Sequence, residues 1–160
     1  MGISSRPGDT NLHRVATFNS DHTRSCIYND KEEIFIKGGL HSLTLFPSDQ
    51  ILLARLLADR QGCYLHSCGV NFNGNGLLFV GHSEAGKSTI ANMLKGKAEI
   101  LCDDRIIIRR QKTEDRKQNN EFRIYGTWSH GDVPDVSAGS APLKAILFLE
   151  KAEENRIMSI

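Results

Sequence analysis

A glycine-rich segment in the middle of the chain has the residue types and the spacing that bind phosphate. It reads Gly81-His82-Ser83-Glu84-Ala85-Gly86-Lys87-Ser88-Thr89. The pattern G-x-x-x-x-G-K-S/T directs several backbone N–H groups at one point, at the positive end of a helix dipole. Lys87 then reaches the β- and γ-phosphates, and the Ser88 hydroxyl ligates Mg²⁺. The sequence therefore predicts that residues 81–89 bind ATP with Mg²⁺.

Two adjacent carboxylates follow the next apolar segment. Phosphoryl transfer needs a carboxylate that holds or orients Mg²⁺ and a group that accepts the proton of the attacking hydroxyl. Asp103 and Asp104 come directly after Ile100-Leu101-Cys102, where such groups are expected. Adjacent side chains on an extended chain point in opposite directions, so we expect the two carboxylates to have different roles. The alternative is that Asp103-Asp104-Arg105 merely opens a solvent-exposed turn.

Taken together, four features resemble the catalytic core of the HPr kinase/phosphorylase family. They are His66, the Gly74-x-Gly76 turn, the loop from Gly81 to Ser88, and Asp103-Asp104-Arg105, in the order and spacing of that family. The resemblance covers about residues 62–108. It implies a P-loop fold shared with the ATP-dependent phosphoenolpyruvate carboxykinases, and a kinase that acts on a serine.

The resemblance also implies roles for single residues. Asp103 is expected to act as the general base on the acceptor serine, and Asp104 to hold Mg²⁺ together with Ser88. Lys87 is expected to contribute to catalysis by contacting the β- and γ-phosphates. His66 is expected beside the phosphates and carboxylates, where it tunes their protonation; a histidine satisfied within a strand is the alternative for that residue.

The sequence departs from the family pattern after Arg105. Residues 125–132 and Pro142-Leu143 look more like uncharacterised HPr-kinase-like proteins, some of which phosphorylate a serine of a ribosomal peptide precursor. His130 and Asp132 are candidates for facing the acceptor, although a polar loop explains them equally well. Relatives continue into helices after the strand that matches residues 145–149, so we expect a C-terminally shortened member. An uncovered apolar sheet face would favour a homo-oligomer.

The elements that must position these groups alternate between strands and helices. Helices are expected from Ser48 or Asp49 to Gly62, and over 87–94 with an end near Gly96. A tight turn is expected at 73–76 and an exposed hairpin loop at 111–121. Strands are expected at 14–18, 33–37, 42–46, 63–67, 69–72, 77–80, 100–102, 106–108, 122–125 and 145–149. This order predicts an α/β fold with a mixed central sheet that carries the P-loop helix, in one domain over 1–160 whose first twelve residues are poorly ordered.

The composition excludes several classes of protein. The chain has 20 lysines and arginines against 19 aspartates and glutamates, which does not call for nucleic acid or an anionic membrane as a partner. An uninterrupted apolar run of about 18 residues, as a membrane span requires, is absent from the sequence. Cys63, His66 and Cys68 have the wrong spacing for zinc. Cys63 and Cys68, like the other two cysteines, Cys26 and Cys102, are expected to be reduced thiols of a cytoplasmic protein.

The leading expectation is an ATP- and Mg²⁺-dependent kinase that phosphorylates a serine of a protein or peptide. A nucleotide-binding module without catalysis is the first alternative. The second is a small-molecule kinase or a carboxykinase-like enzyme, which would need an anion site built from Arg105, Arg109 and Arg123.

Overall fold

The computed structural model describes residues 2–3, 14–29, 48–111, 121–154 and 156–159. The contacts divide the chain into two compact units, Met1–Asp59 and Arg60–Ile160. The expectation of a single domain over 1–160 stays a prediction. The strands expected at 33–37 and 42–46 lie outside the described residues, as does most of the lead-in over residues 1–12.

The first unit contains a small antiparallel sheet and a helix. Its strands are β1 (Gly2–Ile3), β2 (Arg14–Phe18) and β3 (Ser25–Asn29), in the order β1-β2-β3. Helix α3 spans Ser48–Ala58. The strand predicted at 14–18 and the helix predicted to begin at Ser48 or Asp49 are therefore both confirmed.

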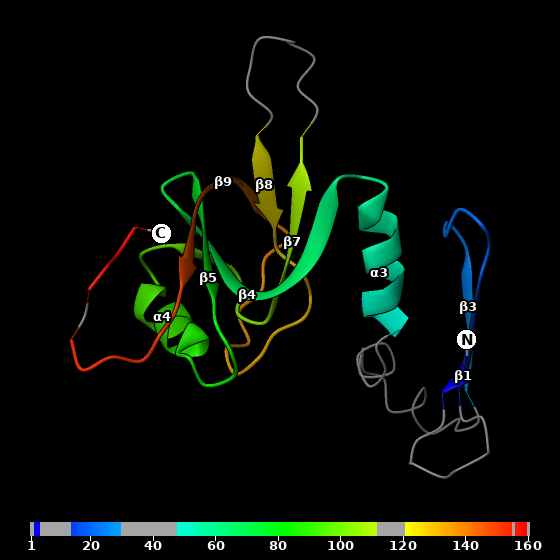
Figure 1. Ribbon diagram of the computed structural model, residues 1–160, viewed down its shortest axis with the longest axis horizontal. Coiled ribbons are helices and arrows are strands. Elements are labelled where there is room, and N and C mark those ends of the chain that lie inside the picture. Colours follow the sequence, from blue (N-terminus) through cyan, green and yellow to red (C-terminus); the bar gives the residue numbers. More distant parts are fainter. Residues whose placement is uncertain (1, 4–13, 30–47, 112–120, 155, 160) are drawn as a thin grey trace. The chain divides into compact units, whose positions relative to one another are not determined.

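The second unit is a six-stranded mixed sheet with one helix among its described residues (Figure 1). The strands lie in the order β5-β9-β8-β7-β4-β6, and an additional pairing of β5 with β4 closes a ring of strands. Among the strands that the structure describes here, β5 and β9 form the only parallel pair. The bounds are β4 (Gly62–Phe72), β5 (Asn75–Val80), α4 (Lys87–Leu94), β6 (Glu99–Cys102), β7 (Arg105–Arg110), β8 (Phe122–Tyr125) and β9 (Ser140–Phe148). The mixed α/β architecture is as predicted.

Strand β4 corrects the prediction of two separate strands at 63–67 and 69–72. It is continuous from Gly62 to Phe72, but its two halves have different neighbours. The first half pairs with β7, while the second half pairs with β5 on one side and β6 on the other. The second half is thus central in the sheet, and its residues 67–70 are buried without interruption. The burial of side chains therefore changes halfway along this one strand, and the sequence pattern changes with it. That change suggested two separate strands.

The tight turn between β4 and β5 has the predicted chemistry. Asn73 has a φ of 50° and Gly74 a φ of 81°, both in the left-handed region that asparagine and glycine adopt most readily. The turn brings β5 back antiparallel to β4, with Phe72 opposite Asn75. Strand β5 then runs directly into the segment predicted to bind phosphate.

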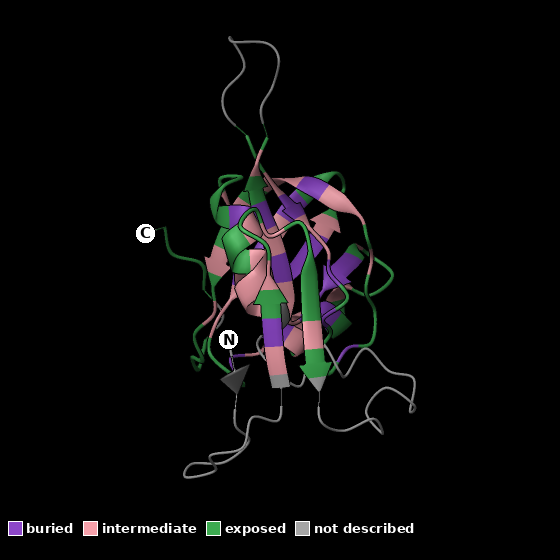
Figure 2. Cartoon of the chain, turned by 90° about the vertical axis from the view of Figure 1, so that its right-hand side faces the viewer, coloured by how far each residue is buried: buried purple, intermediate pink, exposed green. Residues whose placement is uncertain are grey.

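Strand β5 separates two hydrophobic clusters, because adjacent side chains of a strand point to opposite faces. Leu78 packs in a cluster with residues of β6, β7 and β8, while Phe79 packs in a cluster that includes Ala91 of α4. Leu78 and Phe79 are both buried. Figure 2 shows the buried parts of the chain in purple. The prediction that residues 77–80 form a strand covered on both faces is therefore confirmed. Helix α4 is held on the sheet through the second of these clusters, with its N-terminus at the end of β5.

Candidate functional site

The predicted phosphate loop connects the end of β5 to the start of α4. Helix α4 begins at Lys87, and the residue before it, Gly86, has a φ of 107°, which glycine adopts at little cost. A Cβ atom on Gly81 would lie 2.6 Å from the Cβ of Ala85, so the turn at this position requires glycine. The first N–H groups of a helix have no partner within that helix. The N–H groups of the first turn of α4 and the positive end of its dipole therefore lie together where the loop meets the helix.

The side chain of Lys87 folds back over the same loop. Its ammonium group donates hydrogen bonds to the carbonyl oxygens of Gly81, at 2.9 Å, and His82, at 3.0 Å. Only 7% of Lys87 is exposed, which is unusual for a lysine. The loop carbonyls thus hold a cation over the turn, where an anion bound by the backbone donors would meet it.

Ser88 connects the first turn of α4 to the carboxylate of Asp103. The Ser88 hydroxyl donates to Oδ2 of Asp103 over 2.9 Å. Backbone N–H groups of Gly131 and Val133 donate to the same carboxylate at 2.6 and 3.0 Å. Asp103 is 2% exposed, and a buried carboxylate is costly unless such donors satisfy it. Its position beside the phosphate loop is therefore fixed from three directions.

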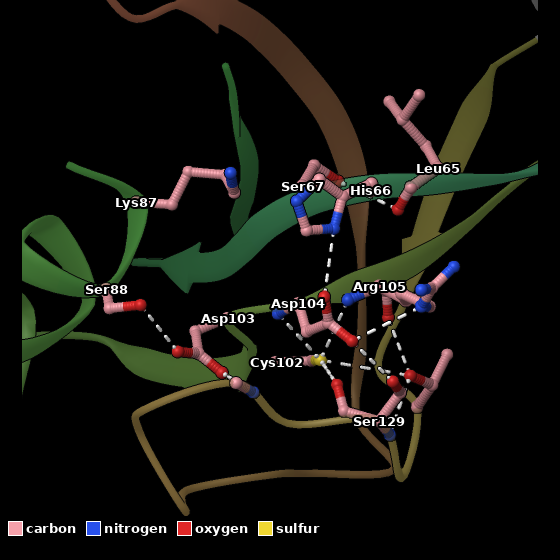
Figure 3. A network of polar contacts seen from close by, with 12 residues as sticks. Leu65, His66, Ser67, Lys87, Ser88, Cys102, Asp103, Asp104, Arg105 and Ser129 are labelled. Atoms are coloured by element: carbon pink, nitrogen blue, oxygen red, sulfur yellow. Dashed lines mark hydrogen bonds and ion pairs between the residues drawn. The ribbon is translucent and has the colours of Figure 1, made fainter. Parts of the chain in front are cut away.

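Asp104 faces a different set of groups (Figure 3). Its Oδ1 lies 2.9 Å from Nδ1 of His66 on β4. Its Oδ2 accepts hydrogen bonds from Ser129 Oγ at 2.6 Å and from Arg105 Nε at 3.3 Å. The side chains of His66 and Asp104 are 46% and 20% exposed, so this pair reaches solvent while Asp103 does not.

The contacts of the two carboxylates differ from those that the resemblance suggests, and their roles stay predictions. Ser88 was expected to share a metal ion with Asp104, but the carboxylate that it contacts is Asp103. The chain turns sharply after β6 ends at Cys102, so Asp103 points to α4 and Asp104 to His66 on β4 (Figure 3). In the described part of the chain, no group of three or more His, Cys, Asp or Glu side chains is arranged to hold a metal ion.

The sulfur of Cys102 stabilises this turn. It accepts hydrogen bonds from the backbone N–H groups of Asp104 and Arg105, both at 3.3 Å, and contacts the carbonyl of Ser129. Burial raises the pKa of the Cys102 thiol, so the group stays protonated near neutral pH. All four cysteines are free thiols.

Sequence reasoning missed the contribution of the loop between β8 and β9. Its residues Thr127, Ser129 and Val133 are buried and contact the carboxylates or the chain beside them. His130 and Asp132, the residues considered for facing the acceptor, are exposed, and that role stays a prediction. The only signal in the sequence was the departure from the family pattern at 125–132. A loop with no periodicity gives no indication of which backbone groups point inward.

The arginines considered for an anion site do not gather in one place. Arg105 lies at the carboxylates and its guanidinium sits 5.9 Å from the ring centroid of Tyr64. Arg109 is four positions further along β7, opposite Arg123 of β8. Arg123 donates to the carbonyl and the hydroxyl of Ser140. Arg109 and Arg123 are thus neighbours on adjacent strands, while Arg105 lies apart from them at the carboxylates.

Comparison with known proteins gives a family and distant likenesses to solved structures. The family model described as "ScmC: SynChlorMet cassette protein ScmC" matches residues 44–160. None of the curated proteins matches the chain. The solved structure of the Hpr(Ser) kinase/phosphatase from Coxiella burnetii is similar with a TM-score of 0.40 and 16% identity, over 61% of this chain and 65% of that one. Among the described residues, no helix is long and apolar enough to cross a membrane.

Proposed function

This chain belongs to the family of SynChlorMet cassette protein ScmC, and we propose that it is an ATP- and Mg²⁺-dependent kinase that transfers the γ-phosphate to a serine hydroxyl of a protein or peptide. The observation that carries the proposal is the hydrogen bond from Ser88 to the buried Asp103. It joins a phosphate-binding loop to the carboxylate that phosphoryl transfer requires. The proposal includes a nucleotide-binding domain of the HPr kinase and phosphoenolpyruvate carboxykinase type, and a cytoplasmic place of action.

The residues of the loop fit a nucleoside triphosphate. A Cβ atom built on Gly86 would meet nothing within 4 Å, so this side of the loop is open. The N–H groups of the first turn of α4 and the ammonium of Lys87 are donors, and phosphate oxygens are acceptors. On binding, the Lys87 ammonium would give up its bonds to the loop carbonyls and contact the β- and γ-phosphates instead. The chain thus supplies positive charge where triphosphate oxygens would lie.

Ser88 and Asp103 are the residues that would hold Mg²⁺. A hydroxyl and a carboxylate are the hard oxygen ligands that this ion prefers, and it normally keeps several waters and phosphate oxygens as further ligands. A set of only two protein ligands is therefore sufficient. When bound, the ion would neutralise the charge that develops on the transferred phosphate.

Asp104 is the better candidate for the general base, the group that takes the proton from the serine hydroxyl of the substrate. The oxygens of Asp103 already accept bonds from Ser88 and two backbone N–H groups in a site that excludes solvent. Asp104 is partly open and has His66 at 2.9 Å, which can share the transferred proton. The proposal therefore assigns the base to Asp104 and the metal side to Asp103, with His66 as the partner of the base.

A protein or peptide acceptor fits the described residues better than a small acid. A carboxylic acid substrate would require arginines converging near the phosphates. Arg109 and Arg123 face each other further along the sheet, on β7 and β8, and Arg123 bonds to Ser140 there. A serine within a peptide requires instead an open approach to the base. His66, at 46% exposed, borders such an approach.

The test is transfer of labelled phosphate from ATP to a library of serine-containing peptides. We expect Mg²⁺-dependent labelling of a subset of peptides by the wild type, and none by Lys87→Ala. Lys97→Ala, in the exposed segment just after α4, is the matched control and should retain labelling. A folded wild type that binds ATP but labels no peptide, and whose ATP turnover equals that of Lys87→Ala, would refute the kinase and support a nucleotide-binding module without catalysis.

A further inference from the structure

We propose that Ser129, in the loop between β8 and β9, is a positioning residue that fixes the carboxylate of Asp104 against His66. This inference rests on the proposed function, because it gives Ser129 a role through the group assigned there as the base. Ser129 Oγ lies 2.6 Å from Asp104 Oδ2, the shortest hydrogen bond that the carboxylate receives. A hydroxyl has one proton, and here that proton is committed to Asp104.

Ser129 is itself held in place by buried contacts. Its backbone N–H donates to Thr127 Oγ1 at 3.2 Å, and its carbonyl contacts the sulfur of Cys102. The Thr127 hydroxyl donates in turn to the carbonyl of Arg105, at 2.6 Å. Ser129 is 9% exposed and Thr127 is 6% exposed. The Ser129 hydroxyl is therefore positioned by a chain of hydrogen bonds that runs through Thr127 to the carbonyl of Arg105, the residue next to Asp104.

Three groups from three parts of the fold orient Asp104. His66 of β4 meets Oδ1, whereas Arg105 of β7 and Ser129 of the loop meet Oδ2. The arginine bond is 3.3 Å long, at the weak end of the range for a hydrogen bond. Without the serine hydroxyl, Oδ2 would retain only this weak bond and the carboxylate could rotate. A base that is displaced by a fraction of an ångström loses much of its effect on the rate.

A second serine of the same loop provides a matched control. The Ser137 hydroxyl also donates to a carboxylate, that of Glu99, and lowers its pKa below the usual value. Glu99 opens β6, at the opposite end of that strand from Asp103 and Asp104. A Ser137→Ala variant therefore removes the same kind of bond from the same loop without touching the candidate site.

The experiment measures the steady-state kinetics of phosphate transfer. Ser129→Ala should lower kcat on the order of tenfold, with KM for Mg-ATP unchanged, because the serine acts on the base and not on the nucleotide. Ser129→Thr, which keeps the hydroxyl, should restore most of kcat, and Ser137→Ala should match the wild type. An unchanged kcat in Ser129→Ala, or a loss confined to KM, would overturn the proposal.

A double-mutant cycle separates positioning from a general structural effect. In an Asp104→Asn background, Ser129→Ala should cause no further loss of kcat, since the group on which it acts has gone. Losses that multiply in the double variant would mean that Ser129 acts independently of Asp104, and would overturn the proposal.

The same cycle measured by urea unfolding does not depend on activity. The midpoint shifts of Ser129→Ala and Asp104→Asn should be non-additive if the two groups are coupled as the geometry indicates. A folded wild type without phosphate transfer would refute the proposed function, while this cycle would still decide whether Ser129 holds Asp104. Additive midpoint shifts would refute the positioning role, even in an active kinase.

Discussion

The hydroxyl of Ser88 and the carboxylate of Asp103 lie 2.9 Å apart, and their contact joins the start of α4 to the end of β6. Fifteen residues separate them in sequence. Because Asp103 also accepts two backbone bonds from the loop between β8 and β9, it connects three parts of the second unit. The carboxylate is therefore expected to serve both the stability of this unit and the binding of a metal ion.

Replacement of Asp103 by asparagine should affect both properties. All three neighbours of the carboxylate donate, so the new amide group would direct its own N–H₂ at a donor. We expect a loss of about 1–3 kcal/mol in the free energy of unfolding, measured in urea. The enhancement of ATP affinity by Mg²⁺ should also be reduced. Asp135→Asn is the control, because its exposed ion pair with Lys95 is worth at most about 1 kcal/mol. Equal stability of both variants would contradict the account of Asp103.

Replacement of Asp104 by asparagine should separate binding from transfer. The amide keeps the shape of the side chain but cannot accept a proton, so phosphate transfer should fall by about 100-fold or more. ATP affinity should stay within about twofold of the wild type, since Asp104 contacts His66 and the carboxylate beside Ser88 is that of Asp103. Calorimetry and the peptide assay measure the two quantities. Asp132→Asn, an exposed change in the neighbouring loop, should alter neither. Full transfer by Asp104→Asn would return the role of base to Asp103.

Replacement of Gly126 by alanine tests the packing of the loop between β8 and β9. A Cβ atom there would lie 1.8 Å from the carbonyl oxygen of Ser137 and 2.8 Å from that of Leu101. These neighbours are backbone atoms, so we expect a loss of about 3 kcal/mol or more in urea unfolding. Gly74→Ala is the comparison, because its φ of 81° is strained for alanine but its Cβ would meet nothing within 4 Å. That variant should lose only about 1–2 kcal/mol. A larger loss from Gly74→Ala than from Gly126→Ala would contradict the described packing.

The thiol of Cys68 should make the protein less stable at alkaline pH. Burial, and after it the nearby charge of Asp103, raises the pKa of this thiol from 9.0 to about 12. A group with a raised pKa in the folded state contributes full stability below its unfolded pKa. That contribution is lost as the pH rises from about 9 towards 12, by about 1.4 kcal/mol per pH unit. Urea unfolding between pH 8 and pH 10.5 measures the slope. Cys68→Ala should show a shallower slope and Cys26→Ala, which changes an exposed thiol, the slope of the wild type.

The locally determined elements of the second unit could be predicted from sequence. Glycine at positions 81 and 86, followed by Lys87, sets the turn and the start of α4 through nearest-neighbour geometry alone. The turn at Asn73 and Gly74 is equally local. Strand β4 was predicted as two strands, because its halves pair with different partners that lie far away in sequence.

The surroundings of the carboxylates depend on contacts that no local pattern contains. The adjacent positions of Asp103 and Asp104 predict that they point apart, but not which of them meets Ser88. That choice follows from the turn held by Cys102 and from a loop about 25 residues further along the chain. Ser129 and Val133 reach the site for the same reason, through the closing of the β8–β9 connection over it.

The central claim is that this chain has a working phosphate site, and calorimetry of ATP binding tests it most directly. The wild type should bind ATP in a manner that Mg²⁺ strengthens, and Lys87→Ala should abolish binding while it remains folded by circular dichroism. Wild-type protein that is demonstrably folded and binds no ATP, with or without Mg²⁺, would contradict the claim and remove the basis of the kinase proposal.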